Sequence, residues 1–211
     1  MTWQLFEKFV ALYRCVKSVA YCGAPVSLSE FHVGARFGWI AGIGIGEQHA
    51  RKVVEAIKQY PTKSSAIARA IAGGNGVSIS TDRGEVDIHE MDSIVINGTS
   101  APAGDLFSLV QLIIGDQQQA PCNEVLQCKL LQSKRKITAE MYEEEMQKAV
   151  DQNVDVFLLI TAAEADSFPL PPRCGLVSKS EFDEYFGLFA CRAYRSFQAP
   201  NINFASYHEL C

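Results

Sequence analysis

Hydrophobic positions recur with a helical period over the start of the chain. Residues 2–22 are therefore expected to form an amphipathic helix, whose apolar side chains are Leu5, Phe9, Leu12, Tyr13 and Val16. A second helix is expected to start within Ser27–Glu30, and two more to cover 47–60 and 64–72, where Pro61 and Gly73-Gly74 would end them. These patterns predict a helical N-terminal segment, residues 1–74, packed on the rest of the protein.

The pattern changes to strands after residue 74. Strands are predicted over 76–80, 89–97, 106–114 and 124–131, with Asp82-Arg83-Gly84 as a turn between the first two. Residues 137–153 return to a helical period, with Met141, Met146 and Ala149 facing inward and Glu143-Glu144-Glu145 forming a solvated face. The apolar stretch 155–162 is typical of a strand buried on both faces. A final helix is expected over 180–194, with a core face of Phe186, Phe189, Tyr194 and Phe197.

This order of elements predicts an α/β fold. Strand 124–131, helix 137–153 and strand 155–162 form a β-α-β unit, which should be parallel and right-handed. The preceding strands form a meander, which would complete a central mixed sheet flanked by helices. Residues 75–211 are therefore expected to be one α/β domain that follows the helical segment.

Strand 124–131 carries polar side chains at unusual places. Alternation puts Val125, Gln127 and Lys129 on one face, and Glu124, Leu126 and Cys128 on the other, so the Cys128 thiol points to the core. Either this strand has a face exposed to water or the lysine meets a negative charge, because a buried, unpaired ammonium is costly. Asp105 would lie nearby if the preceding strand pairs antiparallel. An acid, a carbonyl oxygen and an amine at a sheet edge can hold Mg²⁺ (or Mn²⁺) beside a phosphate.

The combination of Asp105, Gln127-Cys128-Lys129, helix 137–153 and strand 155–162 resembles the QxK variant of the PD-(D/E)XK nuclease superfamily, which has a restriction endonuclease-like core. The stretches PAGDLF, VLQCK and YFGLFACRAY are also similar to the nuclease-like region of Crinkler and retrotransposon hot spot proteins. The resemblance implies a magnesium-dependent endonuclease that hydrolyses phosphodiester bonds of DNA or RNA. It implies Asp105, Gln127 and the Cys128 carbonyl as metal ligands, and Lys129 as the residue that assists the attacking water.

Several alternatives stay open at this point. Asp92, Asp87 or Asp116 could replace Asp105, and Glu55 could be the helix acid that some of these nucleases use. Because Gln127 replaces an Asp or Glu, the region could instead be a catalytically silent interaction domain of a Crinkler-type effector or nuclear protein. A third hypothesis is an unrelated α/β domain with an exposed QCK strand. The chain lacks GxxxxGK[ST], so an ATPase domain or partner would lie outside it.

Residues 40–57 contain a second motif. Gly44-Ile45-Gly46, followed by Ala50, has the spacing of a helix-hairpin-helix, whose backbone N–H groups bind a DNA phosphate. Arg51 and Lys52 would add positive charge. The competing interpretations are a glycine hinge between packed helices and, less well matched, a dinucleotide-binding loop.

Composition narrows these expectations. The 211 residues are 48% hydrophobic and 20% charged, which supports a packed core, and the net charge of −5 does not favour nucleic-acid binding except through a local basic cleft. Seven cysteines without a CxxC pair and four scattered histidines predict no zinc site, and favour reduced thiols in the cytoplasm or nucleus. Charged residues interrupt the first helix, so neither a signal peptide nor a membrane span is expected. Nucleic acid, DNA before RNA, is the expected partner, and a homodimer is left open.

Overall fold

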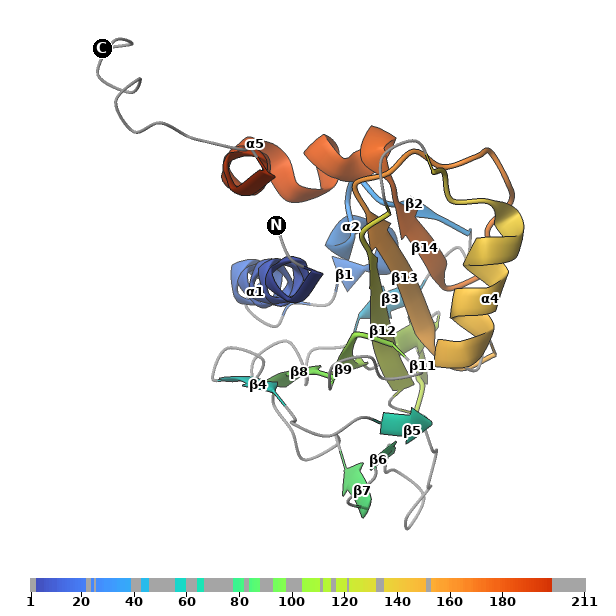
Figure 1. Ribbon diagram of the computed structural model, residues 1–211. Coiled ribbons are helices and arrows are strands. Elements are labelled where there is room, and N and C mark those ends of the chain that lie inside the picture. The colour runs from blue at the N-terminus through green and yellow to red at the C-terminus, as the bar shows by residue number, and fades with distance from the viewer. Residues whose placement is uncertain are drawn as a thin grey trace, which may run out of the picture.

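The computed structural model describes residues 3–21, 24, 26–38, 43–45, 56–59, 64–66, 78–81, 84–87, 93–97, 104–110, 112–114, 117–120, 122–131, 135–150 and 153–198. Its centre is a mixed sheet with helix α4 on one face and helices α1 and α5 on the other (Figure 1). The described part of the chain thus confirms an α/β fold with a mixed sheet flanked by helices.

The central sheet contains seven strands among the described residues, in the order β2-β14-β13-β12-β9-β8-β4. Strands β12 and β13 are parallel, which confirms the pairing predicted for the β-α-β unit, and β9 pairs antiparallel with β12, as expected for the strand that follows Asp105. The strand bounds are β2 Arg36–Phe37, β4 Ala56–Gln59, β8 Ser93–Ile96, β9 Leu106–Val110, β12 Cys122–Lys129, β13 Val156–Thr161 and β14 Cys174–Val177.

Two smaller sheets accompany the central one in the described part of the chain. The first has the order β1-β3-β10-β11, and the second has the order β5-β6-β7. The predicted strand 106–114 is divided, because β9 belongs to the central sheet and β10 to the first small sheet. The bounds are β1 Val26–Ser27, β3 Ile43–Ile45, β5 Ser64–Ala66, β6 Ser78–Thr81, β7 Gly84–Asp87, β10 Leu112–Ile114 and β11 Gln117–Gln118.

Helix α1 (Trp3–Tyr21) confirms the predicted first helix, but its buried face differs from the expected one. Leu5, Leu12 and Val16 are 49%, 57% and 61% exposed. The buried face instead combines apolar residues with polar and charged ones, namely Phe6, Glu7, Val10, Ala11, Arg14, Lys17 and Ser18. The apolar pattern misleads here because Arg14 pairs with the buried Glu124 and the Lys17 ammonium lies over the Tyr185 ring.

The described residues of the expected helical segment 1–74 contain five strands, β1 to β5, and two of these lie where helices were predicted. A short helix, α2 (Leu28–Phe31), does begin at the predicted place, where the Ser27 hydroxyl accepts a hydrogen bond from the Glu30 N–H. Ala56–Gln59 and Ser64–Ala66, in contrast, are strands, and β4 pairs in parallel with β8 of the central sheet. Short apolar stretches fit both periods, so pairing with a distant strand decides their structure. The predicted boundary at residue 74 stays a prediction.

The two later helices agree better with their patterns. Helix α4 (Ala139–Ala149) is capped by Thr138, whose hydroxyl accepts from the Met141 N–H, and it buries Tyr142, Met146 and Ala149. Met141 is half-buried beside them.

Helix α5 (Lys179–Gln198) buries Phe186 and Tyr194 as predicted, but Phe189 is 89% exposed. The helix is kinked at Gly187, whose φ of 73° shifts the residues that follow out of phase with those before it. The side chain of Phe197 lies outside the described ones. Among the described helices, none contains an apolar stretch long enough to cross a bilayer.

Candidate functional site

Among the described residues, the C-terminal end of β12 extends past its ladder with β9. Strand β9 pairs with β12 up to Leu106 opposite Leu126, whereas β13 continues to pair as far as Lys129 opposite Thr161. Gln127, Cys128 and Lys129 therefore extend beyond the ladder with β9. Asp105, which immediately precedes β9, occupies this edge.

Asp105 bonds directly to the QCK stretch. Its Oδ2 accepts hydrogen bonds from Gln127 Nε2 at 2.9 Å and from the Cys128 N–H at 2.6 Å. Asn97 directly follows β8. Its Nδ2 donates to the carbonyl of Gly104, the residue before Asp105, at 2.9 Å. Gly104 has a φ of 45°, and a Cβ there would lie 2.5 Å from the Val125 side chain. A glycine is thus required for the turn that brings Asp105 to Gln127 and Cys128.

The surroundings of Asp105 favour its neutral form. Burial raises its pKa to about 6, the Cys128 hydrogen bond and the Lys129 charge oppose that rise, and the Glu145 charge adds to it. A second acid, Glu7 of α1, is buried nearby, and its pKa is raised to about 8 by burial and by the charge of Asp105. Asp105 therefore lies between two acids, one from each helical layer. The sequence analysis did not single out Glu7.

Lys129 projects to the α4 face, as the alternation predicted. Val125 packs in the α4-side core, whereas Leu126 and Cys128 pack on the α1 and α5 side. The Lys129 ammonium forms an ion pair with Glu145 of α4, with 2.9 Å between Nζ and Oε1. The Glu145 side chain is 18% exposed, so the prediction of a solvated face over Glu143-Glu144-Glu145 is wrong at this residue. Lys129 influences Asp105 electrostatically while it pairs with Glu145.

The oxygen atoms around Asp105 suit a magnesium ion. Carboxylate, carboxamide and carbonyl oxygens are the hard ligands that Mg²⁺ prefers, and the ion is commonly held through one or two carboxylates while it keeps several waters. The Cys128 carbonyl faces the same edge as its N–H, because both groups of a strand residue point to one side. Within the described residues no group of three His, Cys, Asp or Glu side chains is arranged to hold a metal. The residues therefore fit a magnesium site with a single protein carboxylate.

Other predicted site residues lie elsewhere. Gly44 lies within β3 and pairs with Ser27 and Ile113. The helix-hairpin-helix predicted here is therefore wrong at Gly44, whereas its role in binding nucleic acid stays a prediction. Asp87 ends β7 in a small sheet, opposite Ser78. The remaining predicted residues lie outside the described ones, namely Gly46, Arg51, Lys52, Glu55, Asp92 and Asp116.

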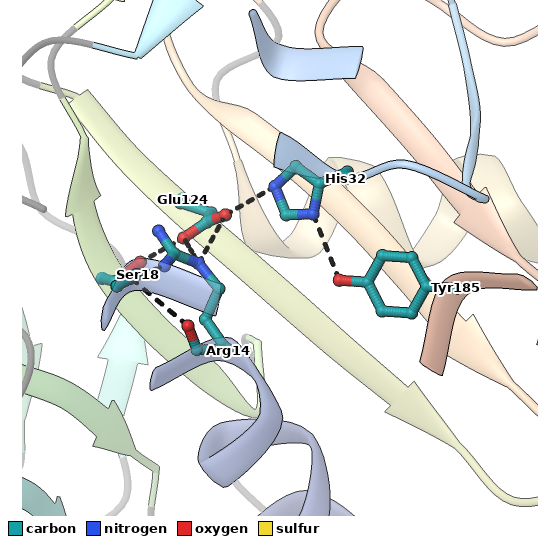
Figure 2. A network of polar contacts seen from close by, with 6 residues as sticks. Arg14, Ser18, His32, Glu124 and Tyr185 are labelled. Atoms are coloured by element: carbon teal, nitrogen blue, oxygen red, sulfur yellow. Dashed lines mark hydrogen bonds and ion pairs between the residues drawn. The ribbon is translucent and has the colours of Figure 1, made fainter. Parts of the chain in front are cut away.

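A second polar group, which the sequence analysis missed, surrounds Glu124 in the first half of β12 (Figure 2). The Glu124 carboxylate is fully buried and lies 2.8 Å from Arg14 Nε and 2.8 Å from His32 Nε2. It also accepts a hydrogen bond from the Ser108 hydroxyl. His32 Nδ1 lies 3.1 Å from the Tyr185 hydroxyl, so the network joins α1, the turn after α2, β9, β12 and α5.

This Glu124 network balances its charges internally. Burial alone would raise the pKa of Glu124, but Arg14, His32 and Ser108 hold it at about 2. Burial lowers the pKa of His32. Lys17 lies beside the network with Nζ 4.0 Å above the Tyr185 ring, and its pKa is lowered to about 8, chiefly by burial. The spacing of Glu7, Arg14, Lys17 and Ser18 along one face of α1 is the sequence signal that could have revealed both polar groups.

Comparison with known proteins supports one part of the resemblance. The chain is 56% identical over all its 211 residues to Crinkler effector protein 108 of Phytophthora sojae. It spans 25% of that protein's length. No family model and no solved structure matches the chain. The resemblance to a Crinkler region is thus confirmed, whereas the relation to PD-(D/E)XK nucleases stays a prediction.

Proposed function

We propose that this protein is a region of a Crinkler-type effector that hydrolyses phosphodiester bonds with Mg²⁺ or Mn²⁺ at the end of β12. The observation that carries the proposal is the contact of the Asp105 carboxylate with both Gln127 and the Cys128 N–H. This contact lies at the end of β12, whose last residue is Lys129.

The electrostatics of Asp105 support a cation site. Its contacts with Gln127 and Cys128 are with uncharged donors, and its raised pKa reflects a desolvated acid whose negative charge is not fully matched. Such strongly perturbed acids cluster at functional sites. A divalent cation would supply the missing charge and lower that pKa.

Each residue has a definite role in the proposal. Asp105, the Gln127 carboxamide oxygen and the Cys128 carbonyl would hold the ion, which when bound would polarise a phosphoryl oxygen and acidify a bound water. The Lys129 ammonium would contact a phosphate oxygen or orient the attacking water. DNA is the first substrate to consider and RNA the second.

A catalytically silent interaction domain is the second candidate. Two observations favour it, because Gln127 provides no second carboxylate and Lys129 is already paired with Glu145. The name of the 56% identical relative describes an effector and specifies no catalytic activity. On this alternative, the edge around Asp105 would bind nucleic acid or protein without cutting it.

Cleavage assays on the purified 211-residue chain separate the two candidates. We expect Mg²⁺-dependent cleavage of supercoiled DNA or of single-stranded RNA, assayed in parallel, and a loss of at least about 100-fold in Asp105→Asn and Lys129→Met. Glu144→Gln and Lys136→Met are matched controls, because they change exposed charges and should leave the rate unchanged.

The outcome decides between the candidates. Wild-type cleavage that vanishes with EDTA and in Asp105→Asn would support the enzyme. Equal rates for the wild type and both site variants, or no cleavage of either substrate, would favour the silent domain.

A further inference from the structure

Lys129 has two acids within its electrostatic reach, and it pairs with the one outside the proposed cation site. Its Nζ lies 2.9 Å from Glu145 Oε1. Both Lys129 and Glu145 alter the pKa of Asp105, in opposite directions, so the three charges are close enough to interact. The position of this ammonium therefore depends on the balance between two carboxylates.

Asp105 is a second acid on the face of β12 that carries Lys129, because its Oδ2 accepts a hydrogen bond from Gln127 Nε2, and Gln127 and Lys129 lie two residues apart on one face. Opposite charges attract strongly where solvent is partly excluded, and the two hydrogen bonds to Asp105 Oδ2 come from the uncharged donors Gln127 Nε2 and the Cys128 N–H. An ammonium bound to Asp105 would compete directly with a divalent cation for the same oxygens. Glu145 prevents this by offering Lys129 a different partner.

We propose that Glu145 is a positioning residue, which holds the Lys129 ammonium beside the site and so keeps the Asp105 carboxylate available for a divalent cation. The inference rests on the proposed function, since it assigns a regulator to that same cation site. Glu145 itself does not bind the ion in this arrangement.

Helix α4 holds Glu145 firmly enough for this role. Tyr142 and Met146 are buried on either side of it, and the Tyr142 hydroxyl donates to the Gly175 carbonyl at 3.0 Å. Lys148 Nζ lies 3.5 Å from the same Glu145 oxygen. Glu145 thus carries an additional neutralising contact from its own helix, and its charge does not depend on Lys129 alone.

The test measures Mn²⁺ affinity of the whole chain by electron paramagnetic resonance, which needs no catalytic activity. We expect Glu145→Gln to weaken Mn²⁺ binding about three- to tenfold, because the released Lys129 occupies Asp105. In a Lys129→Met background, Glu145→Gln should change the affinity less than about twofold. Glu145→Asp should restore part of the affinity, and Glu144→Gln, an exposed acid on the same helix, should have no effect.

Two results would overturn the assignment of Glu145 while leaving the cation site intact. One is an unchanged affinity in Glu145→Gln. The other is an equal loss with and without Lys129, which would make Glu145 a direct ligand or a purely structural residue. If Asp105→Asn binds Mn²⁺ as the wild type does, the cation site itself is wrong, and the role of Glu145 fails with it.

Discussion

The two halves of β12 place carboxylates in opposite surroundings. Glu124 is enclosed, and Arg14 and His32 hold its pKa at about 2 in spite of burial. Asp105 lies against the other end of the strand, where Gln127 and the Cys128 N–H are uncharged donors and burial raises its pKa to about 6. The same strand thus supports one acid that is charge-balanced and one that is not.

This difference separates a structural role from a binding role. A buried carboxylate that pairs with an arginine has no capacity left for a ligand, and its network connects α1, β12 and α5. A desolvated carboxylate with incomplete compensation destabilises the free protein and gains most from a bound cation. Stability measurements on the two acids should therefore differ in sign as well as in size.

The largest effect is expected from Arg14→Ala. This change leaves Glu124 buried without its cationic partner, so the free energy of unfolding should fall by about 3–5 kcal/mol. Urea denaturation followed by circular dichroism measures that free energy directly.

The matched control is Lys179→Ala. Lys179 and Glu164 also form a 2.8 Å ion pair, but their side chains are 65% and 51% exposed. Solvent screening leaves such an exposed pair with little effect on the free energy of unfolding. Similar losses in the two variants would contradict the view that burial makes the Glu124 network the stronger one.

A smaller effect of opposite sign is expected from Asp105→Asn. The amide keeps an oxygen that can accept from Gln127 and Cys128, but it removes an ionised group whose pKa is raised from 3.8 to about 6. At pH 7 and without divalent cations, the variant should be more stable than the wild type by about 1–2 kcal/mol. Thermal and urea unfolding in EDTA check this gain.

Glu124→Gln is the corresponding change at the other end of β12. It should destabilise the protein, because the pKa of Glu124 is depressed and its ionised form pairs with Arg14 and accepts hydrogen bonds from His32 and Ser108. The comparison fails if Asp105→Asn destabilises the protein, or if Glu124→Gln stabilises it.

The sequence predicts the β-α-β unit and the position of Asp105 well, for a physical reason. Strand 155–162 is uniformly apolar and helix 137–153 is clearly periodic, so each has one favoured structure. Asp105 comes directly before a strand whose antiparallel pairing to β12 fixes its position opposite Gln127. Such local patterns do not reveal strand β14 (Cys174–Val177), because this strand is short and follows a proline-rich stretch.

The polar groups on α1 were harder to predict. Leu5, Leu12 and Val16 outline an apolar face, yet the helix turns Glu7 and Arg14 toward the sheet. The reason is visible in the partners, since Glu124 and His32 are distant in sequence and meet Arg14 only in the folded protein. The spacing of Glu7 and Arg14 along one face of α1 is a signal for a polar group there, and the distant partner then shows that the group is buried.

The last prediction concerns Glu7, which links α1 to Asp105. Its pKa is raised from an ordinary value of 4.5 to about 8, so between these pH values the native state holds a proton that the unfolded chain has lost. The corresponding stability is fully present below about pH 4.5 and is lost as the pH rises toward 8. Asp105 contributes in the same direction, but its contribution ends near pH 6.

Glu7→Gln should therefore flatten the fall in the free energy of unfolding between pH 6 and pH 8. The fall below pH 6 that Asp105 causes should remain. Urea denaturation at several pH values in EDTA measures both parts, with Glu143→Gln as the control because Glu143 is an exposed acid. Parallel curves for the wild type and Glu7→Gln would mean that Glu7 is ionised in the native protein. Glu7 would then add its own negative charge to the imbalance around Asp105.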